Sequence, residues 1–184
     1  MFNFEKYKII FFDFDGVIKE SLKIKEKAFI DIFSNKISND LKIFIKKHHN
    51  NNGGVNRSKK IALYLKKAEY KVDKKSINFY SNKFSRIVKK KVINSKWVPG
   101  FKKFIKFNYN SKKLILISAT PNKEIKEIIK KIGINKYIHS VYGDPYKKEK
   151  IIESFILKKN YNPKEICLFG DSLSDHYAAK FNHI

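Results

Sequence analysis

Four short apolar runs, each ending in small or polar residues, predict the strands of a parallel sheet. The runs are KIIFFDF (8–14), KLILISAT (113–120), IHSVYGD (138–144, the weakest) and EICLFGDS (165–172). Continuous apolar runs of this length are typical of strands that are buried on both faces. The amphipathic segments 121–133 and 147–159 separate the last three runs and predict helices. This alternation predicts an open, doubly wound α/β sheet with a Rossmann-like arrangement.

Residues 17–96 break the alternation of strands and helices. They contain helical apolar stripes but no convincing strand; the stripes are SLKIKEKAFIDIF, DLKIFIKK, KKIALYLKK and SINFYSNKFSRIVKK. We therefore expect an α/β core built from residues 1–16 and 97–184, with a small helical domain of residues 17–96 inserted after the first strand. The segment WVPG, which begins at Trp97, is expected to form the hinge by which the chain returns to the core.

The high positive charge of the chain raises the question of whether it binds an anionic partner. The 184 residues carry 41 Lys+Arg against 17 Asp+Glu, a formal net charge of +24. Such an excess fits an anionic partner, and a basic nucleic-acid-binding protein is one alternative. The lysines are spread over every predicted helix, however, which favours a solvated surface and no specific nucleic acid. The single cysteine, the charged N-terminus and the short apolar runs predict a cytoplasmic protein that has neither a signal peptide nor a membrane partner.

Candidate chemistry begins where the first strand ends. Asp13 and Asp15 are two positions apart, so both side chains point to the same side of the strand. Gly16 allows the backbone to turn sharply and approach a ligand closely. One carboxylate could attack phosphorus while the other exchanges a proton. The alternative is a turn that carries two solvated aspartates.

The ends of the later strands supply complementary groups. Asp171 and Asp175 follow the last strand and, together with Asp13, would form an oxygen-rich site of the kind that Mg²⁺ prefers. Ser118 and Thr120 precede a predicted helix, where a hydroxyl group and backbone amides could hold phosphate oxygens. Lysines after residue 144 could balance the charge of a transferring phosphoryl group.

These motifs, in this order, resemble the four motifs of the haloacid dehalogenase superfamily over nearly the whole chain. The inserted helices are similar to the cap of its phosphoglycolate phosphatase and β-phosphoglucomutase-like branch. The resemblance implies Asp13 as nucleophile and Mg²⁺ ligand, and Asp15 as general acid/base whose backbone carbonyl also binds the metal. It further implies roles for residues on the later strands: phosphate binding by Ser118, Ala119 and Lys148, metal binding by Asp171, and support of the metal site by Asp175.

Two departures from the family pattern stand out. The segment from Gly143 to Lys148 aligns with the family's Gly-Ser-Pro-x-x-Lys, which favours Lys148 over Lys147 as the phosphate-binding lysine. Asp144 replaces the serine, so it either places a negative charge near the phosphate or caps the following helix. The chain also ends nine residues after Asp175 (184 − 175), whereas relatives add an edge strand there; either the chain is truncated or its sheet edge is open.

The segment HHNNNGGVNR is the most unusual part of the inserted domain. Its Gly-Val-x-Arg resembles the β-phosphoglucomutase cap loop, which makes Arg57 a candidate ligand for a second anionic group of the substrate. His48 and His49 are further candidates for the substrate site. The alternative is that Arg57 lies on the charged surface and the two histidines simply end a helix.

The sequence therefore predicts a Mg²⁺-dependent phosphomonoester hydrolase that forms an aspartyl-phosphate on Asp13 and acts on a small phosphorylated metabolite, as a monomer. Asp15 argues against carbon–halogen cleavage, which needs no proton at a leaving oxygen. A sugar phosphomutase of the β-phosphoglucomutase type is the nearest alternative, because it would form the same intermediate. The identity of the metabolite stays open.

Overall fold

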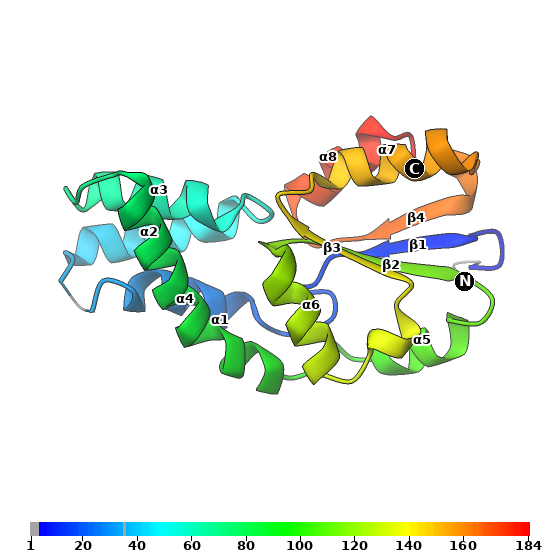
Figure 1. The fold of residues 1–184 in the computed structure, drawn as a ribbon, viewed down its shortest axis with the longest axis horizontal. Coiled ribbons are helices and arrows are strands. Elements are labelled where there is room, and N and C mark those ends of the chain that lie inside the picture. Colours follow the sequence, from blue (N-terminus) through cyan, green and yellow to red (C-terminus); the bar gives the residue numbers. More distant parts are fainter. Residues whose placement is uncertain (1–3, 35) are drawn as a thin grey trace.

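The chain forms two lobes joined by a narrow connection (Figure 1). The structure, a computed structural model, describes residues 4–34 and 36–184; residues 1–3 of the predicted core and residue 35 of the predicted cap lie outside the described residues. The helical lobe contains α1 (Leu22–Asp31), α2 (Asn39–Asn51), α3 (Arg57–Lys67) and α4 (Lys74–Asn94). The sheet lobe contains β1 (Ile9–Phe12), α5 (Phe101–Asn108), β2 (Lys113–Pro121), α6 (Asn122–Lys131), β3 (Ser140–Asp144), α7 (Lys148–Lys159), β4 (Ile166–Phe169) and α8 (Leu173–Phe181), with single 3-10 turns at Asn135–Tyr137 and Pro163–Glu165.

The sheet is parallel, with the strand order β3-β2-β1-β4. Phe12, the last residue of β1, pairs with Leu116 of β2 and with Phe169 of β4. Because the strands run in the same direction and in register, the residues that follow them meet at one edge of the sheet. This confirms the predicted α/β fold and brings the polar strand ends together.

Alternating side chains of β1 divide the core of this lobe into two layers. Ile10 and Phe12 belong to a cluster with residues of α5 and α6, whereas Ile9 and Phe11 pack with residues of α7 and α8. Figure 1 shows the two helix pairs on opposite faces of the sheet. All four β1 side chains are at most 2% exposed, which explains why this strand reads as a continuous apolar run.

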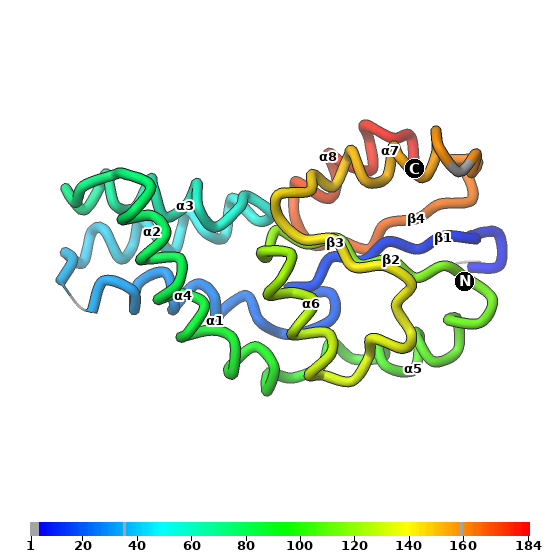
Figure 2. Tube along the Cα trace, in the orientation of Figure 1, coloured from blue at the N-terminus to red at the C-terminus, as the bar shows by residue number. Residues whose placement is uncertain are grey.

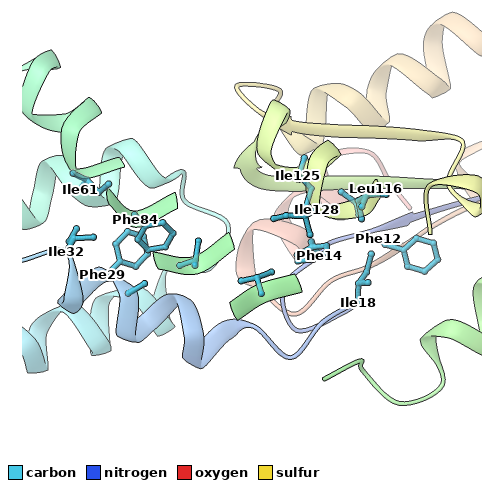
Figure 3. Packing of buried hydrophobic residues seen from close by; sticks show 14 of the residues in the cluster. Phe12, Phe14, Ile18, Phe29, Ile32, Ile61, Phe84, Leu116, Ile125 and Ile128 are labelled. Carbon is cyan, nitrogen blue, oxygen red and sulfur yellow. The ribbon is translucent and has the colours of Figure 1, made fainter. Parts of the chain in front are cut away.

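The helical lobe has an aromatic centre of its own (Figure 3). Phe29 of α1 packs against Phe84 of α4, with ring centroids 4.3 Å apart, and against Tyr64 of α3 at 5.5 Å. Side-chain caps begin three of its helices: Ser38, Asn56 and Asp73 each accept a hydrogen bond from a backbone N–H three residues later. The lobe is therefore packed and capped in its own right.

The two segments that connect the lobes run side by side (Figure 2). Glu20 N donates to Lys96 O at 2.9 Å, and Val98 N donates to Ile18 O at 3.1 Å. Lys19 is 2% exposed; its Nζ lies 4.4 Å from the centre of the Trp97 ring and donates to a backbone carbonyl of α4. Trp97 thus packs at the connection, where the WVPG segment was expected to form a hinge.

Within the described residues, no helix combines the length and the apolar character needed to cross a membrane.

Candidate active site

The carboxyl ends of β1 and β4 face a cavity of about 1040 Å³ that both lobes line. Asp13 directly follows β1, and its backbone N–H donates to Phe169 O at 2.9 Å, which fixes it beside the end of β4. The sheet lobe contributes four aspartates to the cavity wall: Asp13, Asp15, Asp171 and Asp175. The strand ends therefore collect negative charge in one place.

Lys148, at the start of α7, balances part of this charge. Its Nζ lies 3.0 Å from Asp13 Oδ2 and 2.6 Å from Asp175 Oδ1. Burial raises the pKa of Asp13 to about 6, with Asp175 and Asp15 adding to the rise and Lys148 opposing it. Burial lowers the pKa of Lys148, but the two carboxylates outweigh it and hold that pKa above its ordinary value. The neighbouring Lys147 is exposed, so the geometry favours Lys148 as the site lysine.

Three aspartates form an oxygen cluster suited to a divalent cation. One carboxylate oxygen each from Asp13, Asp171 and Asp175 lies within 4.8 Å of the others. Burial raises the pKa of Asp171, and the charges of Asp175 and Asp15 raise it further. Such mutual repulsion is relieved by a hard cation with oxygen ligands, so the residues present fit Mg²⁺.

Asp175 differs from the other two because protein donors already occupy both of its oxygens. Lys148 donates to Oδ1, while Ser172 donates to Oδ2 from Oγ at 2.5 Å and from its backbone N at 3.2 Å. Ser172 and Asp175 thereby form a capping box at the start of α8. This arrangement suits a residue that positions the site better than one that binds a metal directly.

Gly16 explains how the first strand end can lie against the second. Its φ is +74°, and a Cβ at this position would lie 2.1 Å from Asp171 Oδ2. A side chain would therefore displace the Asp171 carboxylate.

Asp15 points toward the helical lobe. Ser21 Oγ donates to its Oδ1 at 2.5 Å, and Lys25 of α1 donates to its Oδ2. Lys25 Nζ also lies 2.8 Å from Thr120 Oγ1. Burial raises the pKa of Asp15, but Lys25 and Ser21 outweigh it, so the pKa lies below its ordinary value. In this arrangement Asp15 is a carboxylate that can accept a proton.

The predicted phosphate-binding segment follows in β2. Ala119 and Thr120 belong to the cavity wall. Ser118 is 3% exposed, and its Oγ accepts a hydrogen bond from the backbone N–H of Thr120 at 3.2 Å. The hydroxyl of Thr120 contacts Lys25 of the helical lobe.

Comparison with known proteins places this geometry in a family. Residues 10–184 match the model of the haloacid dehalogenase-like hydrolases. The chain belongs to this family.

Solved structures with this fold include haloacid dehalogenase-like proteins of related branches. They are a predicted phosphoglycolate phosphatase from Haemophilus somnus 129PT (18% identity, 97% of this chain and 83% of that chain, TM-score 0.73), a candidate β-phosphoglucomutase from Thermotoga maritima (21%, 96% and 82%, 0.68) and a mutant of CbbY from Rhodobacter sphaeroides in complex with xylulose-(1,5)bisphosphate (16%, 97% and 84%, 0.75). No curated protein matches the sequence. The predicted superfamily and enzyme class are confirmed.

In the helical lobe of this haloacid dehalogenase-like chain, Arg57 pairs with a residue of the sheet lobe. The Arg57 guanidinium donates to both carboxylate oxygens of Glu124 in α6, at 2.6 and 2.9 Å, and to Ser85 Oγ at 2.5 Å. Arg57 lines the cavity, but Glu124 occupies the guanidinium edge that a substrate anion would need.

The two candidate histidines, His48 and His49, lie in different environments. His48 bonds to Tyr64 Oη through Nδ1 at 2.9 Å and stacks on Phe44, inside the helical lobe. His49 belongs to the cavity wall and is 7% exposed. Of the two, only His49 is placed to meet a substrate.

Near the cavity, the segment Gly54–Asn56 of the helical lobe contacts the sheet lobe at two places. Asn56 Nδ2 donates to Asp144 Oδ1 at 3.0 Å, so Asp144 pairs with the helical lobe, while Lys147 is the N-cap residue of α7. Gly54, at φ +78°, lies so close to the first turn of α8 that a Cβ would come within 1.7 Å of Ser174 Oγ. The helical lobe is closed over the strand ends.

Sequence reasoning missed Lys25, Lys60 and Glu124, all of which line or close the site. A signal existed for the lysines, because Lys60 is four residues before Tyr64 and Lys25 is four before Phe29, on the buried faces of their helices. Among so many lysines these two did not stand out.

Proposed function

We propose that this chain is a Mg²⁺-dependent phosphomonoester hydrolase that acts on a small phosphorylated metabolite through an aspartyl-phosphate on Asp13. The observation that supports this best is Lys148 Nζ, 3.0 Å from Asp13 Oδ2 beside the cavity. A buried cation at this point favours the ionised nucleophile and can balance charge on a transferring phosphoryl group.

The reaction we propose has two steps. A carboxylate oxygen of Asp13 bonds to phosphorus while the bond from phosphorus to the leaving alcohol oxygen breaks, and that oxygen takes a proton from Asp15, which enters this step protonated. A water oxygen then attacks phosphorus and gives a proton to the Asp15 carboxylate while the bond from phosphorus to Asp13 breaks, which releases phosphate, restores Asp13 and leaves Asp15 protonated for the next turnover. The hydrogen bonds from Ser21 and Lys25 favour the carboxylate form of Asp15 that the second step needs.

Mg²⁺ would be held by the carboxylates of Asp13 and Asp171 and by the backbone carbonyl of Asp15, with Asp175 supporting them. When bound, it stabilises negative charge on the phosphoryl oxygens as a Lewis acid. We propose residues 17–96 as a cap that excludes water and contacts the rest of the substrate.

The pairing of Arg57 with Glu124 removes the arginine on which the phosphomutase alternative was based, because that guanidinium is already occupied. We therefore keep hydrolysis as the proposed reaction.

The test is phosphate release from a panel of phosphorylated metabolites after removal of metal with EDTA, with and without added Mg²⁺. We expect no turnover in chelator, recovery with Mg²⁺, and loss of activity in Asp13→Asn. Asp40→Asn, an exposed aspartate at the start of α2, is the matched control and should keep full activity. Undiminished turnover in EDTA would falsify the metal-dependent mechanism.

A further inference from the structure

The cavity wall contains a buried cation, Lys60, that forms no ion pair with any carboxylate of the described residues. Lys60 of α3 is 3% exposed and lines the cavity. The two other cations of the wall are paired, Lys25 with Asp15 and Arg57 with Glu124. Among the residues that the structure describes, none offers Lys60 a carboxylate within ion-pairing distance. Burial and the charge of Lys25 lower the pKa of Lys60 to about 8, and the charge of Asp15 opposes this only in part.

His49 is the polar partner of Lys60, and this contact decides where its own proton lies. Lys60 Nζ lies 3.1 Å from His49 Nδ1. An ammonium group can only donate, so Nδ1 accepts and the hydrogen of the neutral ring is on Nε2. Burial and the charge of Lys60 lower the pKa of His49 to about 3, so the ring is neutral at physiological pH. His49 therefore carries an N–H donor on Nε2.

That donor has no acceptor. Nε2 of His49 is buried and without a hydrogen-bond partner among the described residues. Phe29 packs near both groups, 5.1 Å from the His49 ring and 5.8 Å from Lys60 Nζ, but an aromatic ring accepts hydrogen bonds only weakly. A buried donor left unpaired costs about 1–3 kcal/mol. His49, whose Nε2 donor lacks an acceptor, and the charged Lys60, whose one polar partner here is His49, thus belong to the same cavity wall.

We propose that His49 and Lys60 form a subsite for an oxyanion, either a carboxylate or a second phosphate, on the part of the substrate that remains after phosphoryl transfer. The proposal rests on the proposed function and narrows its substrate class to phosphomonoesters that carry a second negative group. The same cavity wall contains Asp13, where the transferring phosphoryl group would be attacked. Lys60 takes the role that sequence resemblance suggested for Arg57.

The test compares three substrates: phosphoglycolate, which adds a carboxylate; glucose 1,6-bisphosphate, which adds a phosphate; and 2-hydroxyethyl phosphate, which adds neither. Lys60→Gln keeps a donor for His49 Nδ1 but removes the charge. We expect it to lower kcat/KM for one or both oxyanion substrates, relative to 2-hydroxyethyl phosphate, by about 10- to 150-fold, the usual worth of a charged hydrogen bond. A loss of relative kcat/KM for phosphoglycolate alone identifies the bound group as a carboxylate, and a loss for glucose 1,6-bisphosphate alone identifies it as a phosphate. If Lys60→Gln changes neither ratio to 2-hydroxyethyl phosphate, the proposal is overturned.

Three controls separate binding from folding. Lys59→Gln removes the same charge from the neighbouring exposed position and should not change the ratio. Lys60→Arg keeps a cation and should retain most of the selectivity. Lys60→Gln should melt no lower than the wild type, because it removes an uncompensated buried charge. A lower melting temperature together with an unchanged ratio would assign Lys60 a structural role instead.

A binding measurement keeps this proposal separate from the phosphatase assignment. Asp13→Asn protein, with and without Lys60→Gln, is titrated with phosphoglycolate and with glucose 1,6-bisphosphate by calorimetry. If the wild type hydrolyses no member of the metabolite panel, the proposed function fails. Binding that requires Lys60 would still support the oxyanion subsite, and binding indifferent to Lys60, or none, would reject it.

Discussion

The guanidinium of Arg57 in the helical lobe donates two hydrogen bonds to the carboxylate of Glu124 in the sheet lobe, from Nη1 to Oε2 at 2.9 Å and from Nη2 to Oε1 at 2.6 Å. Both residues are 8% exposed. Burial raises the pKa of Glu124, but the hydrogen bonds and charge of Arg57 outweigh it and lower the pKa below its ordinary value. The pair ties the two lobes together next to the cavity.

Glu124→Gln should destabilise the protein strongly. It leaves the buried Arg57 charge without its counter-ion, a change that typically costs about 3–5 kcal/mol of unfolding free energy. Urea unfolding measures the effect. Lys89→Gln is the control, since Lys89 of α4 pairs with Glu127 of α6 between the same two lobes in an exposed setting. It should cost less than about 1 kcal/mol, and equal losses in both variants would contradict the role given to burial.

Lys148→Gln should lower kcat by about 100- to 1000-fold, the usual cost of removing one group that stabilises transition-state charge. The variant leaves Asp13 and Asp175 facing each other without their shared cation. Steady-state kinetics in saturating Mg²⁺ provide the measurement. Lys147→Gln, at the exposed neighbouring position, should behave like the wild type. If the Lys147 variant lost activity and the Lys148 variant kept it, the order of the two lysines in the site would be reversed.

His49 should make the protein sensitive to acid. Its pKa falls from 6.5 to about 3 in the folded state, so between these values the unfolded chain binds the extra proton. The unfolding free energy should therefore fall as the pH drops below 6.5, by about 1.4 kcal/mol per pH unit from this group.

The comparison uses His49→Asn, which keeps an acceptor for Lys60 but cannot titrate in this range. Urea unfolding at pH 6.5 and pH 5 should show about 2 kcal/mol less acid destabilisation in this variant than in the wild type. His183→Asn, at an exposed position near the C-terminus, should leave the wild-type pH dependence in place. Parallel pH profiles for wild type and His49→Asn would show that His49 is not held neutral by the fold.

Gly54→Ala should disturb the contact between the lobes. The new Cβ would meet Ser174 Oγ at 1.7 Å and Ser174 Cβ at 2.6 Å, on a backbone with φ +78°. Gly100→Ala separates the two effects, because Gly100 has φ +82° but nothing within 4 Å of its Cβ position. The control should cost about 1–2 kcal/mol from backbone strain alone.

Gly54→Ala should lower both the melting temperature and kcat/KM beyond that control. Adding Ser174→Gly should restore part of the loss by making room for the methyl group. If Gly54→Ala matched Gly100→Ala in both measurements, Gly54 and Ser174 would not be in contact in solution.

The sequence was sufficient for the sheet and for the carboxylates at its edge, because both follow from local patterns. The run Ile9–Phe12 is apolar at every position since both faces are covered, and Asp13 and Asp171 come where such runs stop. The pairing of Arg57 with Glu124 could not be predicted in the same way. The two residues are 67 positions apart, and nothing in either segment indicates how the lobes close. The interior lysines were hidden for a different reason: among 41 basic residues, position on a helix face is the only local sign of burial.

The paired connection at Lys19 and Trp97 has a mechanical consequence. Two backbone hydrogen bonds hold its two segments together, and the buried Lys19 attaches them to α4 through a hydrogen bond to a backbone carbonyl. Segments fastened in this way permit swinging about one axis but resist sliding and twisting. The contacts made by Arg57, Asn56, Lys25 and Lys89 all span the same gap, so a single swing must break them together. Admission of a substrate should then be all-or-none, with a rate set by how often these contacts break at the same time.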